Sequence, residues 1–516
     1  MKKDEFYILG LNSTGPNTSA CLIHNERGIL AFAEEERFSR VKLATDKIPT
    51  DSIKYCLEKE GLSLESITAM TVGWDHKKYP EFMAEFYKKN MSHPEKDEYS
   101  KNLEAFRLAD KSTYSINKKL QIAFSRAGIE GPMPKLVFEH HHQSHVASVF
   151  YPSPFETALV VVIDGSGEEL ATSIWLCEGE MFSLLRAFEL PDSLGYFYGA
   201  MTEFLGFSIF TGEGKVMGMA PYGQPNLEFR KRLESFLKVS DDGSYTVDPR
   251  YIYFGPRMSS FRYTDYLSEL LCLPPRTPES DINQVHYDLA YETQLLLENV
   301  VSRLIRQYVL STSVPRVCIA GGVANNCKMN GVISSLPEVE SCFVVPASAD
   351  SGVAYGSALL YLGKIQNTAN GLRKSYNACL GPSFSDDQVI ACLRDAKISS
   401  YKVMSDDELF YHTADLLAEG KIVAWFQGRM ENGARALGNR SILVHPGFQD
   451  MKIKINREVK RREAFRPFAP SVLTENASDW FCFDAQGYPE ETHKWMIQAA
   501  PAREHSKKII PAVTHI

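Results

Sequence analysis

The sequence predicts an α/β protein of two or three domains, the first of which contains a duplicated sheet. A chain of 516 residues is too long to fold around one core. Apolar runs rich in β-branched residues alternate with helical patterns, which is typical of α/β folds. One pattern of three strands joined by short turns also occurs twice. These observations together indicate mixed sheets covered by helices.

The first copy of the pattern lies at the N-terminus. Its strands are FYILGLN, SACLIHN and ILAFAEEE, and a strand at ITAMTVGWD follows later. The intervening segment PTDSIKYCLEKEGLS predicts a helix that begins at Pro49, is capped by Thr50 or Asp51 and ends at Gly61. The Tyr- and Lys-rich segment 76–126 is predicted to be helical and peripheral.

The second copy begins at residue 158. ALVVVIDGSG, ATSIWLCEGE and MFSLLRAFEL are its strands, a long helix is predicted over 287–310, and RVCIAGGVANN and CFVVPASADSGVAYGSALL each lead from a strand into a helix. Such a duplication is also the pattern of the superfamily of actin, heat-shock chaperone ATPases and sugar kinases (ASKHA), which holds a nucleotide between its halves. A polar segment at 363–385 predicts a boundary between domains 1–370 and 371–516.

Bulk composition excludes several classes of protein. The net charge of −8 disfavours sequence-independent nucleic-acid binding, which needs a basic surface. Ten cysteines form no CxxC pair and are expected to be reduced thiols. The N-terminus does not resemble a signal peptide, and no apolar run reaches about 20 residues, the length of a membrane helix. We therefore expect a cytoplasmic protein.

Two histidines suggest a metal site. If HHHQSHVASVF is helical, His141 and His145 lie on one face, and the strand that ends at Ile163 delivers Asp164 nearby. Packing of the histidines within a helix is the alternative explanation. Asp350 follows another strand of the duplicated fold, and the set of His141, His145, Asp164 and Asp350 favours a first-row divalent metal. No glutamate follows the first histidine, which excludes a metalloprotease motif.

Three glycine-rich turns suggest a nucleotide or acyl-nucleotide ligand. Backbone amides at such turns hold phosphates, although glycine marks tight turns in any case. Lys215 would supply a counter-charge. The residues concerned are Gly165, Ser166 and Gly167, the segment 212–215, and Gly321, Gly322 and Asn325.

The C-terminal region is rich in arginine. A solvated basic face is one explanation, but these residues alternate with Gly, Ala, Phe and Pro, and Arg435 and Arg466 are expected to be half-buried. Guanidinium groups in that environment usually pair with carboxylates or phosphates. We therefore expect a small anionic ligand. The basic residues are Arg429, Arg435, Arg440, Lys460, Arg461, Arg462 and Arg466.

The chain resembles the carbamoyltransferases of nodulation-factor and antibiotic biosynthesis. The matching segments, in the order of that family, are AEEERFSRVK, HHQSHVAS, DGSGE, GEGKVMGMAPYG, AGGVANN, ADSGVAYGSAL, GRMENGARALGNRSIL and REAFRPFAPSVL. The resemblance implies an ASKHA-type N-terminal domain, similar to the threonylcarbamoyl-tRNA-modification ATPases, and a YrdC-like C-terminal domain. It implies that carbamoyl phosphate and ATP form carbamoyl adenylate, whose carbamoyl group passes to a hydroxyl of a small molecule or natural product.

The resemblance also implies roles for particular residues. His141, His145, Asp164 and Asp350 would bind the metal, with iron(II) expected there and magnesium on the ATP. Lys215, Arg435 and Arg466 would be catalytic. The residues implied to hold carbamoyl phosphate and ATP are Arg435, Asn439, Arg440, Ser441, Asn456, Lys460, Arg462 and Arg466.

Two departures from the family pattern keep alternatives open. Pro16 and Asn17 stand where the family commonly has His-Asp, and Leu43 stands where it often has histidine, so a base near the acceptor hydroxyl is missing or replaced. The chain ends at PAVTHI, where the family continues, so we expect either a truncated chain or an incomplete activating domain. The alternatives are a catalytically impaired relic and a threonylcarbamoyl-type tRNA-modifying enzyme.

The acceptor itself is not identified by the sequence. Segments 79–114 and 257–264 are expected to border its binding cleft, but loops diverge freely on a shared scaffold. The oligomeric state is open as well, and a homo-oligomer is compatible with the sequence.

Overall fold

The computed structural model divides into two compact units. The first comprises Met1–Tyr376 and Ala485–Ala499, and the second comprises Asn377–Asp484 and Ala500–Ile516. The return of 485–499 to the first unit was not expected from the sequence. The structure describes residues 5–13, 15–45, 47–75, 82, 85–86, 89–90, 113–254, 261–366, 376–483 and 494–515. Most of the expected acceptor segment 79–114, and residues 257–260 of the other, lie outside these ranges.

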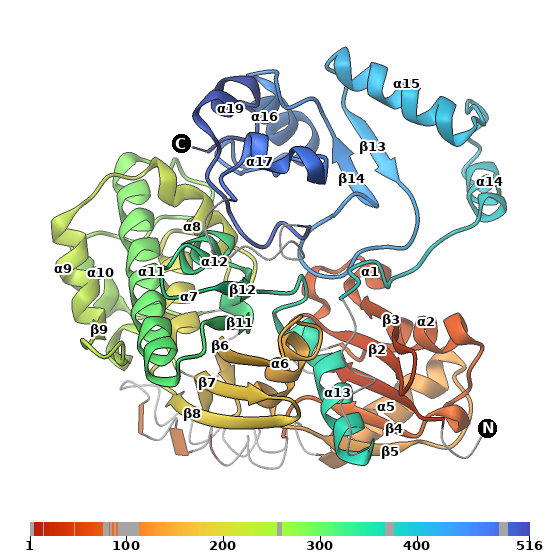
Figure 1. Ribbon diagram of the computed structural model, residues 1–516, viewed down its shortest axis with the longest axis horizontal. Coiled ribbons are helices and arrows are strands. Elements are labelled where there is room, and N and C mark those ends of the chain that lie inside the picture. The colour runs from red at the N-terminus through yellow and green to blue at the C-terminus, as the bar shows by residue number, and fades with distance from the viewer. Residues whose placement is uncertain are drawn as a thin grey trace. The chain divides into compact units, whose positions relative to one another are not determined.

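Two five-stranded mixed sheets form the framework of the first unit (Figure 1). The first sheet has the order β3-β2-β1-β4-β5 and the second has the order β8-β7-β6-β11-β12. In each, three antiparallel strands are followed by two parallel ones. The predicted duplication and α/β class are therefore confirmed. The strands are β1 (Tyr7–Asn12), β2 (Ser19–His24), β3 (Gly28–Glu34), β4 (Ala69–Val72), β5 (Lys135–Phe138), β6 (Thr157–Gly167), β7 (Leu170–Glu178), β8 (Met181–Glu189), β11 (Arg316–Ala320) and β12 (Ser341–Phe343).

Two helices, α6 (His141–Phe150) and α13 (Val353–Gln366), lie between the sheets (Figure 1). Helix α13 packs on β1, β2 and β4, α6 packs on β6 and β11, and the two helices pack on each other. Glycine makes this close packing possible. A Cβ on Gly10 would lie 1.9 Å from the Ala354 carbonyl oxygen, and one on Gly356 would lie 2.0 Å from that of Ser144.

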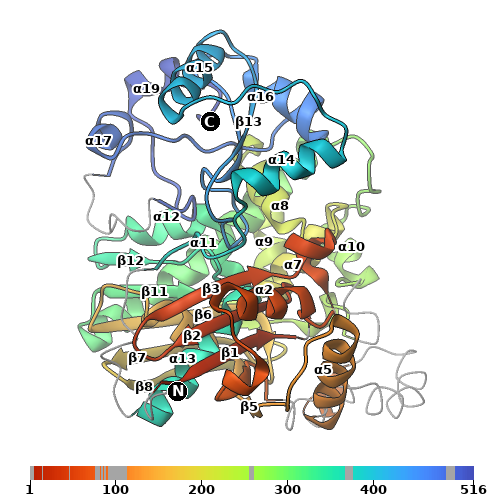
Figure 2. The same cartoon turned by 90° about the vertical axis from the view of Figure 1, so that its right-hand side faces the viewer.

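The opposite face of the first sheet carries an apolar core. The labels β1, β2, β3, α2 and α5 in Figure 2 mark the elements around it. Side chains alternate along a strand, so Gly10 faces α13 whereas Leu9 and Leu11 enter this core. Helices α2 (Thr50–Glu60) and α5 (Thr113–Ala127) complete it. The predicted Gly61 C-cap of α2 is confirmed.

The predicted cap of α2 by Thr50 or Asp51 is wrong. Pro49 occupies the N-cap position and neither neighbour caps the helix through its side chain. The buried Glu35 carboxylate instead accepts hydrogen bonds from the backbone N–H groups of Asp51 (3.2 Å) and Ser52 (2.9 Å). A partner directly after β3 thus satisfies helix donors that the local sequence leaves open.

Residues 165–167 do not form the expected turn. Strand β6 continues through Gly167, with an irregular register between Ile163 and Gly167, and the turn comes after it. The extra residues in this bulge break the regular pairing and redirect the strand end. Glycine therefore serves close packing here, since a Cβ on Gly167 would lie 2.3 Å from the His141 ring.

Most other helices of the first unit lie on the side of the second sheet, whereas α1 packs against β3 and α2. The predicted long helix is confirmed as α11 (Gln284–Thr312). Segment 494–499 packs in this unit, where the Ala499 N–H donates to the Cys327 carbonyl. The further elements are α1 (Glu36–Ser39), α7 (Leu194–Phe204), α8 (Glu213–Met219), α9 (Leu227–Phe236), β9 (Leu237–Val239), β10 (Tyr245–Val247), α10 (Asp265–Leu271), η5 (Gly322–Asn325), α12 (Cys327–Ser334) and η6 (Asp350–Gly352).

The second unit is smaller and is built around an antiparallel pair of strands. Its apolar cluster includes Met451, Ile455 and Ala512. The helix predicted in SDDELFYHTADLLAEG is confirmed, with a Ser405 capping box. The YrdC-like fold of this unit stays a prediction. Its elements are α14 (Asp386–Asp395), α15 (Asp406–Ala418), β13 (Val423–Phe426), β14 (Arg440–Leu443), α16 (Met451–Lys454), η7 (Ile455–Lys460), α17 (Ala477–Trp480) and α19 (Glu504–Ile509).

In the described parts of the chain, no helix combines the length and the apolar character needed to cross a membrane. All ten cysteines are free thiols, and Cys21, Cys318 and Cys342 are buried as expected.

Replacing Gly10 by alanine tests the close packing of α13 on β1. The new Cβ would meet a backbone carbonyl that cannot move alone, so Gly10→Ala should lower the free energy of unfolding by about 1–3 kcal/mol, as overpacked cores do. Gly214→Ala is the control, because no atom lies within 4 Å of its added Cβ. Thermal unfolding should show a lower Tm for the first variant alone, and equal Tm values would contradict this packing.

The stability of the second unit should fall in acid through His515. Burial and the nearby Lys452 lower the pKa of this half-buried imidazole from about 6.5 to about 4. The folded unit therefore favours the neutral form, so the stabilisation is complete above pH 6.5 and is lost as pH falls towards 4. The loss amounts to roughly 3 kcal/mol. Thermal unfolding between pH 7 and 4 should show a flatter profile for His515→Phe, whereas His412→Phe, at an exposed site, should follow the wild type.

Candidate functional site

Four buried side chains converge between the two sheets. Helix α6 begins at His141, and the spacing of four residues places His141 and His145 on one face, as predicted. Asp164 comes from β6 and Asp350 from η6, at the start of α13. One ligand atom from each of the four residues lies within 4.8 Å of the others. The structure thus brings together all four residues of the expected metal set.

The geometry of this His–Asp cluster fits a metal ion. The Nε2 atoms of His141 and His145 lie 3.2 and 3.3 Å from Asp164 Oδ2, and 3.9 and 3.8 Å from Asp350 Oδ1. The two Nε2 atoms lie 3.1 Å apart. Two imidazoles and two carboxylates that turn their donor atoms to one buried point form a donor set suited to a first-row divalent metal.

Neighbouring groups orient the donor atoms. The Nδ1 of His141 lies 2.9 Å from the Gly73 carbonyl oxygen, so a proton on Nδ1 leaves Nε2 as the lone-pair donor. The other carboxylate oxygen of Asp164 accepts hydrogen bonds from the backbone N–H groups of Gly165 (2.8 Å) and Gly322 (3.2 Å). The expected glycine segments therefore hold the Asp164 carboxylate in place.

Charge coupling within the cluster is strong. Burial raises the pKa of Asp164, but hydrogen bonds from His141 and His145 outweigh it and hold that pKa well below its usual range. For His141, burial is outweighed by Asp164 and Asp350, which raise the imidazole pKa to about 9. Burial lowers the pKa of His145. A divalent cation would replace the shared proton as the balancing positive charge.

Glu168 was missed by the sequence analysis. Its buried carboxylate accepts hydrogen bonds from the backbone N–H groups of His141 (3.1 Å) and Asp75 (2.6 Å), and it thereby caps α6. Burial raises its pKa. Glu168 lies in the turn after β6, and no periodic pattern in the sequence pairs it with a helix 27 residues earlier.

The remaining residues expected at a nucleotide site of the first unit lie around this cluster and on α8. Gly321 adopts a φ of 92°, and a Cβ there would lie 2.3 Å from the Ile163 carbonyl oxygen. Asn325 ends η5 and accepts a hydrogen bond from Ser348 at 3.4 Å. Ser166 lies 2.7 Å from the Tyr196 hydroxyl. Lys215 belongs to α8, with its Nζ 5.0 Å from the centre of the Phe207 ring.

The second unit contains a cluster of three half-buried guanidinium groups. Burial lowers the pKa of Arg462 to about 10, and the positive charges of Arg466 and Arg435 add to this effect. Burial and Arg435 also lower the pKa of Arg466, and burial and Arg462 lower that of Lys460. We call Arg435, Lys460, Arg462 and Arg466 the basic cluster. Mutual repulsion of this kind is relieved by a bound anion.

Asn456 organises the basic cluster from beneath. Its buried side-chain oxygen accepts a hydrogen bond from Arg462 Nε at 2.7 Å, and its Nδ2 donates to the carbonyls of Ala464 (3.3 Å) and Arg466 (3.0 Å). These contacts use the amide group fully. The structure therefore gives Asn456 a positioning role beside the arginines.

The other expected ligand residues of this unit are tied to the backbone. Arg440 donates to the carbonyls of Gln427 (2.5 Å) and Pro382 (3.2 Å), and it stacks on Phe426. Asn439 Nδ2 donates to the Arg429 carbonyl, and Ser441 Oγ accepts from the Gly438 N–H.

Buried Glu431, also missed from the sequence, holds this loop together. Its carboxylate accepts the backbone N–H groups of Leu437, Asn439 and Arg440. Residues 437–440 thus form a loop closed around one carboxylate, distinct from the basic cluster.

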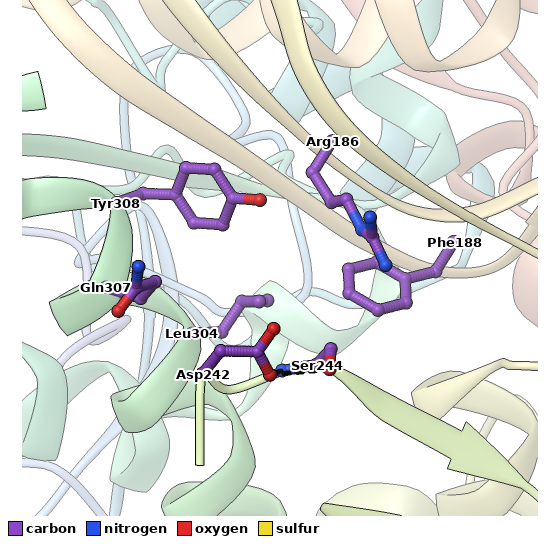
Figure 3. A pocket seen from close by; sticks show the side chains of 7 residues that line it. All are labelled: Arg186, Phe188, Asp242, Ser244, Leu304, Gln307 and Tyr308. Carbon is purple, nitrogen blue, oxygen red and sulfur yellow. Dashed lines mark hydrogen bonds between the residues drawn. The ribbon is translucent and has the colours of Figure 1, made fainter. Parts of the chain in front are cut away.

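A separate pocket lies between β8, the β9–β10 turn and α11 (Figure 3). It encloses about 120 Å³. Arg186, Phe188 and Asp242 line it together with Tyr308 of α11. None of the residues expected from the sequence to bind ligands is among those that line it.

Comparison with known proteins gives matches over nearly the whole chain. The family described as Carbamoyltransferase N-terminus matches residues 7–359, and Carbamoyltransferase C-terminus matches residues 414–516. An uncharacterised protein of Synechocystis is 34% identical over 96% of this chain and 80% of its own length. The nodulation protein NolNO of Sinorhizobium fredii is 32% identical over 98% of this chain and 69% of its length, and NolO of Bradyrhizobium diazoefficiens is 34% identical over 73% and 65%.

Metal analysis of purified variants tests the His–Asp cluster. We expect about one divalent first-row metal ion per chain, and its loss in His145→Ala and Asp164→Asn, since either change removes a donor from a buried four-ligand site. His142→Asn is the matched control on the same helix, because His142 lies 2.7 Å from Ser173 Oγ and is outside the cluster. Equal metal content in all four proteins would rule out a metal site here.

Proposed function

We propose that this chain, which belongs to the carbamoyltransferase family, transfers a carbamoyl group from carbamoyl phosphate to a hydroxyl group through an ATP-derived carbamoyl adenylate. The observation that carries the proposal is the pairing of two charge environments in one chain. The first unit has a His–Asp cluster suited to a divalent cation, and the second has a basic cluster suited to anions.

The second unit would form the adenylate. Carbamoyl phosphate and ATP are both polyanions, and three guanidinium groups can hold their phosphates bidentately. In this step water hydrolyses carbamoyl phosphate to carbamate and inorganic phosphate. A carbamate oxygen then bonds to the α-phosphorus of ATP, and pyrophosphate leaves. Asn456 would keep Arg462 in position, since it accepts the Nε hydrogen bond.

The first unit would carry out the transfer. A metal ion bound by His141, His145, Asp164 and Asp350, for which we propose iron(II), would supply Lewis acidity that polarises the carbonyl and steadies the departing phosphate. The acceptor oxygen attacks the carbonyl carbon, and AMP leaves. The backbone of Gly165 and Gly322 would keep Asp164 correctly oriented throughout.

The acceptor proton must pass to a group other than residues 16 and 17. Proline has no basic side chain, and the amide of Asn17 does not accept a proton near neutral pH. Their segment is also held by Asn12, whose Nδ2 donates to the carbonyls of Pro16 (2.9 Å) and Asn17 (3.1 Å). We infer that the loop shapes the site through its backbone, and that the acceptor is a hydroxyl compound bound nearby.

Pyrophosphate release tests the adenylate step. Wild-type protein with ATP and magnesium should release pyrophosphate only when carbamoyl phosphate is present. Arg462→Ala should reduce the rate at least about a hundredfold. The change removes a charge-assisted, bidentate contact to a substrate phosphate and leaves that phosphate without its positive partner. His145→Ala should reduce it far less, because its cluster lies in the other unit. Arg457→Ala is the control, with an exposed guanidinium paired to Glu458.

Absence of carbamoyl-phosphate-dependent release in the wild-type protein would overturn the adenylate step. ATP binding without release, measured by calorimetry, would identify the chain as a catalytically impaired member of the family.

A further inference from the structure

Arg262 is a buried arginine in the segment 257–264 that is expected to border the acceptor cleft, and the proposed mechanism gives it no role. Only 2% of the residue is exposed. Its backbone is fixed on both sides, since its N–H donates to Glu203 Oε2 (2.5 Å) and its carbonyl accepts from the Tyr253 N–H (2.8 Å). From this fixed backbone the side chain extends to α7.

The guanidinium group lies over an aromatic ring of α7. Its Cζ is 3.8 Å from the centre of the Tyr196 ring, within the range of a cation–π contact. Stacking uses the face of the guanidinium and leaves its N–H groups pointing outward in the plane. The buried Nη1 finds no hydrogen-bond acceptor among the described residues.

Arg276 shows how this fold satisfies an arginine that is merely structural. It is similarly buried, yet it donates to three backbone carbonyls, those of Leu205, Gly206 and Ser280. Arg262 makes no such hydrogen bonds. The carboxylates of Glu203 and Glu213 attract its charge, but its Nη1 is left without an acceptor among the described residues. A buried donor without an acceptor is costly, and an anionic ligand would supply one.

The position of Arg262 connects it to the His–Asp cluster through one aromatic ring. The Tyr196 hydroxyl lies 2.7 Å from Ser166 Oγ, two residues after Asp164. A Cβ on Gly165 would lie 2.7 Å from the same ring, so Tyr196 rests directly on the backbone that carries the metal ligand. We propose that Arg262, Tyr196 and Ser166 form a subsite for an oxyanion of a bound substrate beside this end of β6.

The occupant follows from the proposed function, on which this step rests. Two oxyanions could reach a subsite beside the transfer centre: the phosphate of the nucleotide that carries the carbamoyl group, or an acid group of the acceptor. Both would receive planar, charge-assisted hydrogen bonds from the guanidinium. Titration with a nucleotide and with inorganic phosphate distinguishes these two occupants.

Calorimetric titration of AMP, adenosine and inorganic phosphate tests the subsite. The Arg462→Ala background removes the strongest competing anion site, and metal is kept equal in all samples. Arg262→Met should weaken anion binding by about ten- to a hundredfold, with adenosine affinity unchanged. Arg262→Lys should lie between, because it keeps the charge and loses the fork. Arg276→Met should lower the Tm but leave anion affinity intact.

The pattern of losses identifies the occupant. Weaker binding of AMP in Arg262→Met assigns the nucleotide phosphate, whereas weaker binding of inorganic phosphate alone assigns an acid group of the acceptor. Unchanged affinity for both anions would overturn the proposal, and if Arg262→Met does not fold, unchanged affinities in Arg262→Lys would do so. Lack of pyrophosphate release by the wild-type protein would count against the proposed function and would not affect these titrations.

Discussion

The arrangement of the first unit depends on how the Asp164 carboxylate is held at the end of β6. One oxygen accepts backbone hydrogen bonds from Gly165 and Gly322, which join the ends of two neighbouring parallel strands, and the other faces His141 and His145. A buried carboxylate is tolerated only when its hydrogen bonds are complete. One side chain therefore links β6, α6 and the loop before α12.

Close packing by glycine makes that convergence possible. Gly10 and Gly356 let α13 approach β1 and α6 closely enough for Asp350, at the start of α13, to meet residues from the other half. Gly167 leaves room for the His141 ring. A side chain at any of these positions would displace a helix and, with it, a donor atom of the His–Asp cluster. The duplicated sheets thus act as a rigid frame whose halves contribute to one cluster.

The two units carry unlike charge environments. In the first, paired carboxylates and imidazoles are balanced best by a cation. In the second, the guanidinium groups of Arg435, Arg462 and Arg466 repel one another and are balanced best by an anion. Arg440, by contrast, donates to the backbone carbonyls of Gln427 and Pro382.

The sequence by itself predicted most strands of the two sheets, their duplication and the long helix, which follow from local periodicity and residue type over a few neighbouring positions. The four members of the His–Asp cluster were predicted from the duplicated fold together with the family resemblance. The partners of buried acids were decided only by the tertiary structure: Glu35 caps α2, Glu168 caps α6 and Glu431 closes the loop around Asn439. Such contacts join residues far apart in the chain or turned by an irregular backbone, and they leave no periodic signal. The bulged end of β6 and the different surroundings of Arg262 and Arg276 were likewise decided by the tertiary structure. Strand pairing and the burial of a charge both depend on residues that are distant in the sequence.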